Sequence, residues 1–284
     1  MIIDGKKVSD KIKSELKNKV YKLKEGGIVP GLAVILVGNN PASKIYVKNK
    51  QKACEEIGIQ SRQYLLDEKT SQKDLLELIE HLNKSTQTHG ILVQLPLPSH
   101  IDEFTVAQAI NAEKDVDCFN ASNVGKLILD KSNLLPCTPA GIIELLKRYH
   151  IQIQGKNCTI VGRSNIVGKP LALMMLKENS TVTICHSKTL ELENFCRQAD
   201  ILISAVGKQK TIKADMVKPK ATVIDVGINR NSEGKICGDV DFSGVFPKAG
   251  FITPVPGGVG PMTIAMLMKN VICAAELHLS SPLD

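Results

Sequence analysis

The stretch CTIVGRSNIVGKP at 158–170 joins a short β-branched run to a glycine-containing turn, with a proline where a helix would begin. A strand–turn–helix junction of this kind leaves backbone N–H groups free at the start of the helix, where they bind a phosphate well. The turn starts at Gly162 but departs from the pattern GxGxxG, because Ser164 and Val167 stand where its second and third glycines would be. A tight structural turn explains these residues equally well, so the neighbouring strands must decide.

The next predicted strand, TVTICH at 181–186, ends without an acidic residue. Sites that prefer NAD usually place a carboxylate there, where it binds the ribose 2′-hydroxyl. Here Ser187 and Lys188 follow the strand and Arg163 lies in the preceding turn, so that the site offers hydrogen-bond donors and positive charge. These groups suit a 2′-phosphate, which a carboxylate would repel. The pattern therefore predicts NADP rather than NAD.

Apolar strand-like runs alternate with helical stretches along the whole chain, which is typical of an α/β fold with parallel strands. The predicted strands are 32–38, 60–66, 90–97, 158–162, 181–186, 199–207 and 222–228. Thr138 and Pro139 can cap and open a helix that leaves the first set of strands. A last helix from about Thr263 to Leu277 is expected to return to the first domain.

A chain of 284 residues is in the range where one core begins to split into two. We expect an N-terminal α/β domain over 1–138, completed by the C-terminal helix at 264–284. A Rossmann-like nucleotide-binding domain is expected over 139–263, with a cleft between the two domains.

The first half carries a second group of candidate site residues. Asn40, Pro41 and Gly58 predict the cap, first residue and glycine stop of a helix over 41–56. Tyr46 and Lys50 then share one face of that helix, and Gln94 ends the strand run GILVQ. Ligands of open α/β sheets bind at the carboxyl ends of the strands. A surface Tyr–Lys pair and a solvated Gln are the alternatives, as is an ordinary Asx-turn for the segment at 115–117.

Composition narrows the classes of function. No apolar run reaches the roughly 18 residues that span a bilayer, and the start MIIDGKKVSD lacks the long apolar stretch of a signal peptide, so we expect a cytoplasmic protein with no membrane partner. The eight cysteines are scattered singly, which predicts neither disulfides nor a metal site. The net charge of +7 is spread along a chain with only 4% aromatic residues, which fits an anionic small ligand and predicts no nucleic-acid partner.

Six motifs occur in one order along nearly the whole chain. They are S-x-x-Y-V-x-x-K at 43–50, VQLPLP at 93–98, KDVD at 114–117, GRSNIVGKP at 162–170, CHSKT at 185–189 and TPVPGGVGPMT at 253–263. In these motifs the chain resembles the bifunctional methylenetetrahydrofolate dehydrogenase/cyclohydrolases. The resemblance implies NADP-dependent oxidation of 5,10-methylenetetrahydrofolate to the methenyl cation, and hydrolysis of that cation to 10-formyltetrahydrofolate. It also implies a homodimer in the one-carbon metabolism that serves purine and amino-acid biosynthesis.

The resemblance implies a role for each candidate residue. Lys50 manages the proton of the hydrolysis, Gln94 holds Lys50 without favouring its charged form, Tyr46 positions the folate, and Asp117 accepts hydrogen bonds from the pterin. The implied catalytic residues are Lys50, Gln94, Tyr46 and Asp117, and the same four bind substrate together with Pro256, Gly257 and Gly258. The implied cofactor-binding residues are Gly162, Arg163, Ser164, Ile166, Val167, Ser187 and Ile228.

One residue departs from the family pattern, because Cys118 follows DVD where the family usually has glycine. If that position needs a positive φ, the loop that carries Asp117 is expected to rearrange slightly. We interpret Cys118 as structural, because neither reaction requires a covalent nucleophile. Apart from the resemblance, two alternatives remain: an NADP oxidoreductase of the shikimate dehydrogenase type, and a nucleotide sensor or RNA-binding protein without catalysis.

Overall fold

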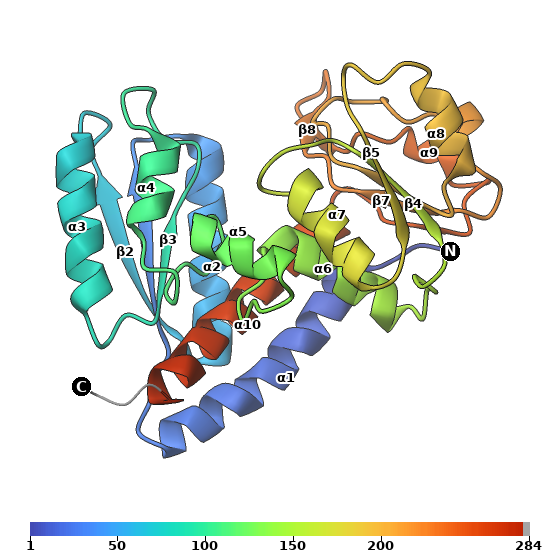
Figure 1. The fold of residues 1–284 in the computed structure, drawn as a ribbon. Helices are drawn as coiled ribbons and strands as arrows, with labels where there is room; N and C mark the ends of the chain where they lie inside the picture. The colour runs from blue at the N-terminus through green and yellow to red at the C-terminus, as the bar shows by residue number, and fades with distance from the viewer. Residues whose placement is uncertain (281–284) are drawn as a thin grey trace. The chain divides into compact units, whose positions relative to one another are not determined.

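The computed structural model describes residues 1–280, which form two compact units, each with its own parallel sheet (Figure 1). The five-stranded unit consists of Met1–Ser9 and Thr138–Thr263. The three-stranded unit consists of Asp10–Cys137 and the residues from Ile264 onward. Residues 281–284 of the predicted segment 264–284 lie outside the described residues.

In the three-stranded unit, strand β1 (Gly31–Val37) lies between β2 (Gln60–Leu66) and β3 (Gly90–Val93), and both pairings are parallel. Every residue of β1 and of β3 is buried, which explains why these strands appear in the sequence as continuous apolar runs. The helices of this unit are most of α1 (Gly5–Glu25), α2 (Pro41–Ile57), α3 (Gln72–Lys84), α4 (Glu103–Ala109), α5 (Ala121–Ile128) and most of α10 (Val259–Ser280).

Helix α2 has the ends that its sequence predicts. Asn40 Oδ1 accepts the amide hydrogens of Ala42 and Ser43 at 2.9 and 3.1 Å, and Pro41 opens the helix. Gly58 ends it with a φ of 88°. Strand β3, by contrast, ends at Val93 rather than at residue 97, because the prolines at 96 and 98 have no N–H to donate to a sheet.

The five-stranded unit contains a wholly parallel sheet in the order β10-β7-β6-β4-β5. Its strands are β4 (Asn157–Val161), β5 (Thr181–Cys185), β6 (Ile201–Ser204), β7 (Thr222–Asp225) and β10 (Phe251–Ile252), and a separate hairpin pairs β8 (Asn229–Arg230) with β9 (Ile236–Cys237). Its helices are α6 (Cys137–Arg148, from Thr138 on), α7 (Gly168–Lys177), α8 (Leu192–Gln198), α9 (Phe242–Val245) and the short 3₁₀ helix η1 (Ala214–Met216).

Several predicted boundaries in this half were wrong. Strands β6 and β7 are shorter than 199–207 and 222–228. After β6 the amides of Val206 and Gly207 donate to the Asp239 carboxylate, and after β7 the amide of Gly227 donates to Asp225 Oδ1. Thr138 does not cap α6, which begins at Cys137, and its hydroxyl instead meets that of Thr263 at 2.9 Å. The last helix is also longer than predicted and spans Val259–Ser280.

The two edges of the five-stranded sheet differ. The N-terminal residues cover the β10 edge, where Ile3 N donates to Ile252 O at 2.8 Å and Ile252 N donates to Met1 O at 2.9 Å. Within residues 1–280, no strand pairs with the outer side of β5, and Ile184 on this strand is 40% exposed. Strand β5 is therefore an open edge with free backbone groups.

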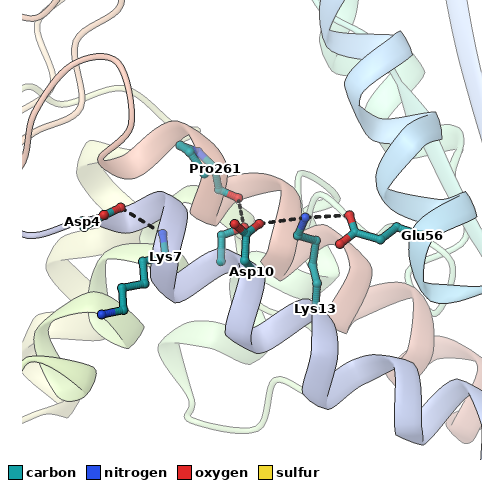
Figure 2. A network of polar contacts seen from close by, with 7 residues as sticks. Asp4, Lys7, Asp10, Lys13, Glu56 and Pro261 are labelled. Carbon is teal, nitrogen blue, oxygen red and sulfur yellow. Dashed lines mark hydrogen bonds and ion pairs between the residues drawn. The ribbon is translucent and has the colours of Figure 1, made fainter.

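Helix α1 is held by polar contacts at its N-terminal part (Figure 2). Within the three-stranded unit, Lys13 Nζ lies 3.0 Å from Asp10 Oδ1 and 2.7 Å from Glu56 Oε2. Within the five-stranded unit, Ser9 Oγ donates to Pro261 O at 3.0 Å. No helix in the described part of the chain is long and apolar enough to cross a membrane.

Candidate functional site

A lysine–glutamine pair lies at the carboxyl edge of the three-stranded sheet. Lys50 Nζ, on α2, donates to Gln94 Oε1 at 2.9 Å, and only 9% of Lys50 is exposed. The Gln94 side-chain amide donates to Leu95 O at 2.7 Å, which orients the side-chain oxygen toward the lysine. The backbone N–H of Gln94 also donates to Ile35 O of β1 at 2.8 Å. The structure thus brings together two predicted residues from segments 44 positions apart.

Asp117 reaches the same edge because its segment runs alongside β3. Ile91 N donates to Lys114 O at 2.8 Å, and Ile91 forms a parallel bridge with Asp115. Burial raises the pKa of the Asp117 carboxyl, and the positive charge of Lys50 opposes that rise. This electrostatic coupling places Asp117 within the influence of the Lys50–Gln94 pair.

The two aspartates of the DVD segment have different environments. Asp115 is 2% exposed and accepts hydrogen bonds from Asn120 N at 2.8 Å and Asn123 Nδ2 at 3.0 Å, so it anchors the following loop. Asp117 is partly exposed, and both aspartates line a small hollow whose other walls are largely apolar side chains of β3 and α4, together with Leu95 and Phe119. Sequence reasoning missed Leu95 and Phe119, because exposed and buried apolar residues look alike in a loop.

Tyr46 lies one helical turn before Lys50 on α2, and 36% of it is exposed. Burial raises the pKa of its hydroxyl, which therefore stays protonated and can donate a hydrogen bond. The ring presents an apolar surface beside the lysine, as a residue that positions a flat ligand would.

Cys118 itself takes the left-handed conformation that was expected to require glycine. Its φ is 61° and its side chain is 3% exposed. Burial raises the pKa of the Cys118 thiol well above its ordinary value, so the thiol stays protonated. A protonated, buried thiol is not a nucleophile, which agrees with its structural interpretation.

In the five-stranded unit, the turn after β4 depends on two glycines. A Cβ on Gly162, whose φ is 134°, would lie 2.3 Å from Ala205 O. A Cβ on Gly168 would lie 2.2 Å from Gly162 O. Gly168 thus allows the close helix–strand packing for which the dinucleotide pattern uses its third glycine. In that pattern the third glycine would stand one residue earlier, at the position of Val167.

The same turn presents free backbone donors. Ser164 Oγ accepts the amide hydrogens of Val167 at 3.2 Å and Gly168 at 3.3 Å, so this hydroxyl caps helix α7. Among the residues that the structure describes, the four amides from Arg163 to Ile166 donate to no protein acceptor, and all four residues are exposed. Such a run of free N–H groups at the start of a helix is a cradle for a phosphate.

The basic residues predicted to bind a 2′-phosphate lie at the same edge. Gly162 N donates to Cys185 O at 2.9 Å, so the turn after β4 adjoins the turn after β5 that carries Ser187 and Lys188. Arg163, Ser187 and Lys188 are all exposed. Within residues 1–280, neither Arg163 nor Lys188 pairs with a carboxylate, so both charges are available to an anion.

Three further predicted residues surround this edge. The side chains of Ile166 and Ile228 are 45% and 53% exposed, although isoleucine is usually buried, and Val167 is partly buried. Ile228 lies in the loop after β7. These side chains offer apolar contacts at the edge where parallel sheets bind nucleotides.

The turn over Pro256, Gly257 and Gly258 is fixed by the N-terminal segment of the same unit. Lys6 N donates to Gly257 O at 3.0 Å, and a Cβ on Gly5 would lie 1.8 Å from Gly258 O. Gly5 is therefore required for this packing, and sequence reasoning missed it because a single early glycine carries no local signal. In the described part of the chain, no group of three or more His, Cys, Asp or Glu residues is arranged to hold a metal ion.

Comparisons with known proteins agree with this geometry. The catalytic domain of tetrahydrofolate dehydrogenase/cyclohydrolase matches residues 3–117, and the NAD(P)-binding domain of the same family matches residues 136–279. A bifunctional protein FolD from Agathobacter rectalis is 60% identical over 275 residues, which cover 97% of this chain and 99% of that protein.

Solved structures lead to the same family. The FolD methylenetetrahydrofolate dehydrogenase/cyclohydrolase of Campylobacter jejuni is 54% identical with a TM-score of 0.96, over 98% of this chain and 99% of that one. The Trypanosoma brucei enzyme, solved with NADP and an inhibitor, is 35% identical with a TM-score of 0.95, over 99% of both chains. A shikimate dehydrogenase from Aquifex aeolicus, at 11% identity and a TM-score of 0.52 over 89% of this chain and 98% of that one, shares the fold alone. The chain belongs to the tetrahydrofolate dehydrogenase/cyclohydrolase family.

Proposed function

We propose that this protein oxidises 5,10-methylenetetrahydrofolate to the 5,10-methenyl cation with NADP and then hydrolyses that cation to 10-formyltetrahydrofolate. The observation that carries the proposal is the partly buried Lys50–Gln94 hydrogen bond, whose lysine interacts electrostatically with Asp117. A plain dehydrogenase of this substrate needs no such pair, whereas an enzyme that also adds water to the product does.

The first reaction makes few chemical demands on the protein. Removal of a hydride from a carbon between two nitrogens gives a delocalised amidinium, so alignment matters more than a strong base. Bound NADP supplies the hydride acceptor. The fit of the chain to this cofactor rests on the free amides after Gly162 for the diphosphate, and on Arg163, Ser187 and Lys188 for the 2′-phosphate.

The second reaction requires proton transfer, which we assign to Lys50. A water molecule that attacks the cation must lose a proton, and a neutral amine within hydrogen-bond distance can take it. The position of Lys50 suits this role, because its amine is held 2.9 Å from the side-chain oxygen of Gln94 and only 9% of the residue is exposed.

We assign substrate binding to two residues near this pair and, in the five-stranded unit, to a glycine turn. Tyr46 provides a ring and a hydroxyl for the folate, and Asp117 accepts hydrogen bonds from the amino edge of the pterin. The glycines at 257 and 258 allow close backbone approach to a ligand, and no atom lies within 4 Å of a Cβ built on Gly257. With this assignment the proposed folate domain is 1–138 with 264–284 and the proposed NADP domain is 139–263. In the structure, however, Met1–Ser9 and Thr138 belong to the five-stranded unit.

We also propose that the protein is a homodimer that pairs through β5. Within the described residues this strand is the open edge of its sheet, and it carries the exposed Ile184. The eight free cysteines suit a reducing compartment, so we place the enzyme in the cytoplasm. Light scattering of the purified protein tests the dimer. A Val182→Pro variant, which removes an N–H on the outer side of β5, is expected to give monomers, because Thr181 and Cys185 bond to the β4 side and the alternate residues face outward.

The direct test of the dehydrogenase uses purified protein with NADP and 5,10-methylenetetrahydrofolate, and follows the absorbance of reduced nicotinamide. We expect turnover with the folate and none with shikimate. Reduction of NADP by shikimate would favour the rival dehydrogenase. Binding of NADP without any turnover would favour a nucleotide sensor.

A further inference from the structure

One buried carboxylate organises the chain beyond the ends of β6 and β7. Asp239 is 0% exposed, yet its two oxygens accept five hydrogen bonds. The donors are Ser204 Oγ at 3.2 Å, Val206 N at 2.7 Å, Gly207 N at 3.2 Å, Lys208 N at 3.0 Å and Asn229 Nδ2 at 2.9 Å. Three consecutive amides on one carboxylate fix the backbone of that loop.

A second buried carboxylate holds Asp239 in place. Asp225 Oδ1 accepts the amide hydrogen of Asp239 at 2.9 Å, and Asp225 Oδ2 accepts that of Val240 at 2.9 Å. Two glycines make room for the carboxylates, because a Cβ on Gly227 would lie 2.1 Å from Asp239 Oδ1 and one on Gly238 would lie 1.9 Å from Asp225 Oδ2. The arrangement therefore depends on both aspartates and both glycines together.

The loops after β6 and β7 lie at the carboxyl ends of their strands, where a parallel sheet binds a dinucleotide. In the order β10-β7-β6-β4-β5, the chain passes from β4 to β5 on one side and continues with β6 on the other. Dinucleotides bind across such a switch point, at the carboxyl ends of the strands. The turns after β4 and β5 carry the groups assigned to the phosphates, so the loops after β6 and β7 face the other half of the cofactor.

Two exposed apolar side chains lie in these loops. Val206, in the loop after β6, is 41% exposed, and Ile228, in the loop after β7, is 53% exposed. Asp239 contacts the backbone of Val206 and the side chain of Asn229, which follows Ile228. A single carboxylate thus links the two loops that carry apolar surface for a nicotinamide ring.

We propose that Asp239 is a positioning residue that holds the loops after β6 and β7 in the conformation that binds the nicotinamide half of NADP. The proposal rests on the NADP site described under the proposed function. Asp239 is buried and does not touch the cofactor, so its effect passes through Val206, Ile228 and the backbone between them.

The test compares two ligands in an Asp239→Asn variant. Calorimetry with 2′,5′-ADP reports the phosphate side of the site alone, and calorimetry with NADP reports both sides. We expect NADP affinity to fall by about 10-fold or more, because the new side-chain NH₂ group would face backbone N–H groups that are themselves donors. The affinity for 2′,5′-ADP is expected to stay within about 2-fold of the wild type.

Asp241→Asn is the matched control, because Asp241 lies two residues away, outside this network, and accepts from Ser243 Oγ at 3.1 Å. If Asp239→Asn does not fold, Asn229→Ala removes one donor and leaves the carboxylate in place, and a selective loss of about 3-fold in NADP affinity is expected. Equal losses for both ligands, or no loss for either, would overturn the positioning role. Failure of the wild type to bind either ligand would overturn the NADP site as well.

Discussion

The carboxyl edges of the two sheets differ in the groups that they offer to a ligand. The edge of the three-stranded sheet presents side chains, among them Lys50, Gln94 and Asp117, to which we assign the chemistry. The edge of the five-stranded sheet presents mostly backbone, with free amides in the turn after Gly162 and close packing at Gly168. An edge made of side chains is disabled by removing a functional group, whereas an edge made of backbone is disabled by adding a methyl group.

The largest expected effect is on hydrolysis in Lys50→Met. The variant keeps an unbranched side chain of nearly the same length but has no group that can take a proton, so hydrolysis of 5,10-methenyltetrahydrofolate is expected to fall by at least about 100-fold. Loss of methenyl absorbance without NADP measures this rate. Lys48→Met is the control, because Lys48 lies on the exposed face of the same helix. Hydrolysis at the wild-type rate in Lys50→Met would remove Lys50 from the mechanism.

The corresponding change in the other unit is Gly162→Ala. The new Cβ would lie 2.3 Å from Ala205 O at a φ of 134°, so the turn must move or the protein loses roughly 1–3 kcal/mol of stability. We expect NADP affinity to fall by roughly 10-fold or more while methenyl hydrolysis continues. Unchanged NADP binding and melting temperature would show that the turn is not closely packed.

A smaller effect is expected for the side chain of Arg163, at the edge of the five-stranded sheet. Arg163 is exposed, so its contact with a 2′-phosphate is screened by solvent, and Arg163→Ala is expected to weaken NADP binding by about 10-fold. Binding of NAD, which lacks that phosphate, should change little. Titration of both cofactors checks this, and equal losses would contradict the placement of the 2′-phosphate at Arg163.

The smallest expected effect concerns the backbone conformation of Cys118, in the three-stranded unit. Cys118 holds a φ of 61°, which costs an L-residue about 1 kcal/mol. Two variants that both lack the thiol isolate this cost, and Cys118→Gly is expected to be more stable than Cys118→Ala by up to about 1 kcal/mol. Urea unfolding measures the difference. Greater stability of the alanine variant would mean that the left-handed backbone carries no cost here.

The same contrast explains how far the sequence could be interpreted. Side-chain chemistry is local and recognisable, so the caps of α2, the shared face of Tyr46 and Lys50, and the missing acid after β5 could all be predicted. The parallel α/β fold followed from the alternation of apolar runs with helices. Family resemblance then supplied the roles of Gln94 and Asp117, which spacing alone left open.

The missed features depend on contacts between distant segments. Strand β6 ends early because Asp239, more than 30 residues after Val206, accepts the amide hydrogens of the loop that follows the strand. Gly5 is needed for a carbonyl at Gly258, and Gly168 packs against the carbonyl of Gly162. Sequence periodicity does not predict such contacts, because each depends on how segments that are far apart in the sequence pack together.

The most direct test of the whole account measures two products in one sample. Wild-type protein is given NADP and 5,10-methylenetetrahydrofolate, and reduced cofactor and 10-formyltetrahydrofolate are quantified together beside a Lys50→Met sample that reports uncatalysed hydrolysis. The account predicts that the wild type forms the two products in equal amounts, while methenyltetrahydrofolate still persists in the variant. Reduced cofactor with no formyl product beyond the uncatalysed amount would contradict the claim that this chain joins both reactions.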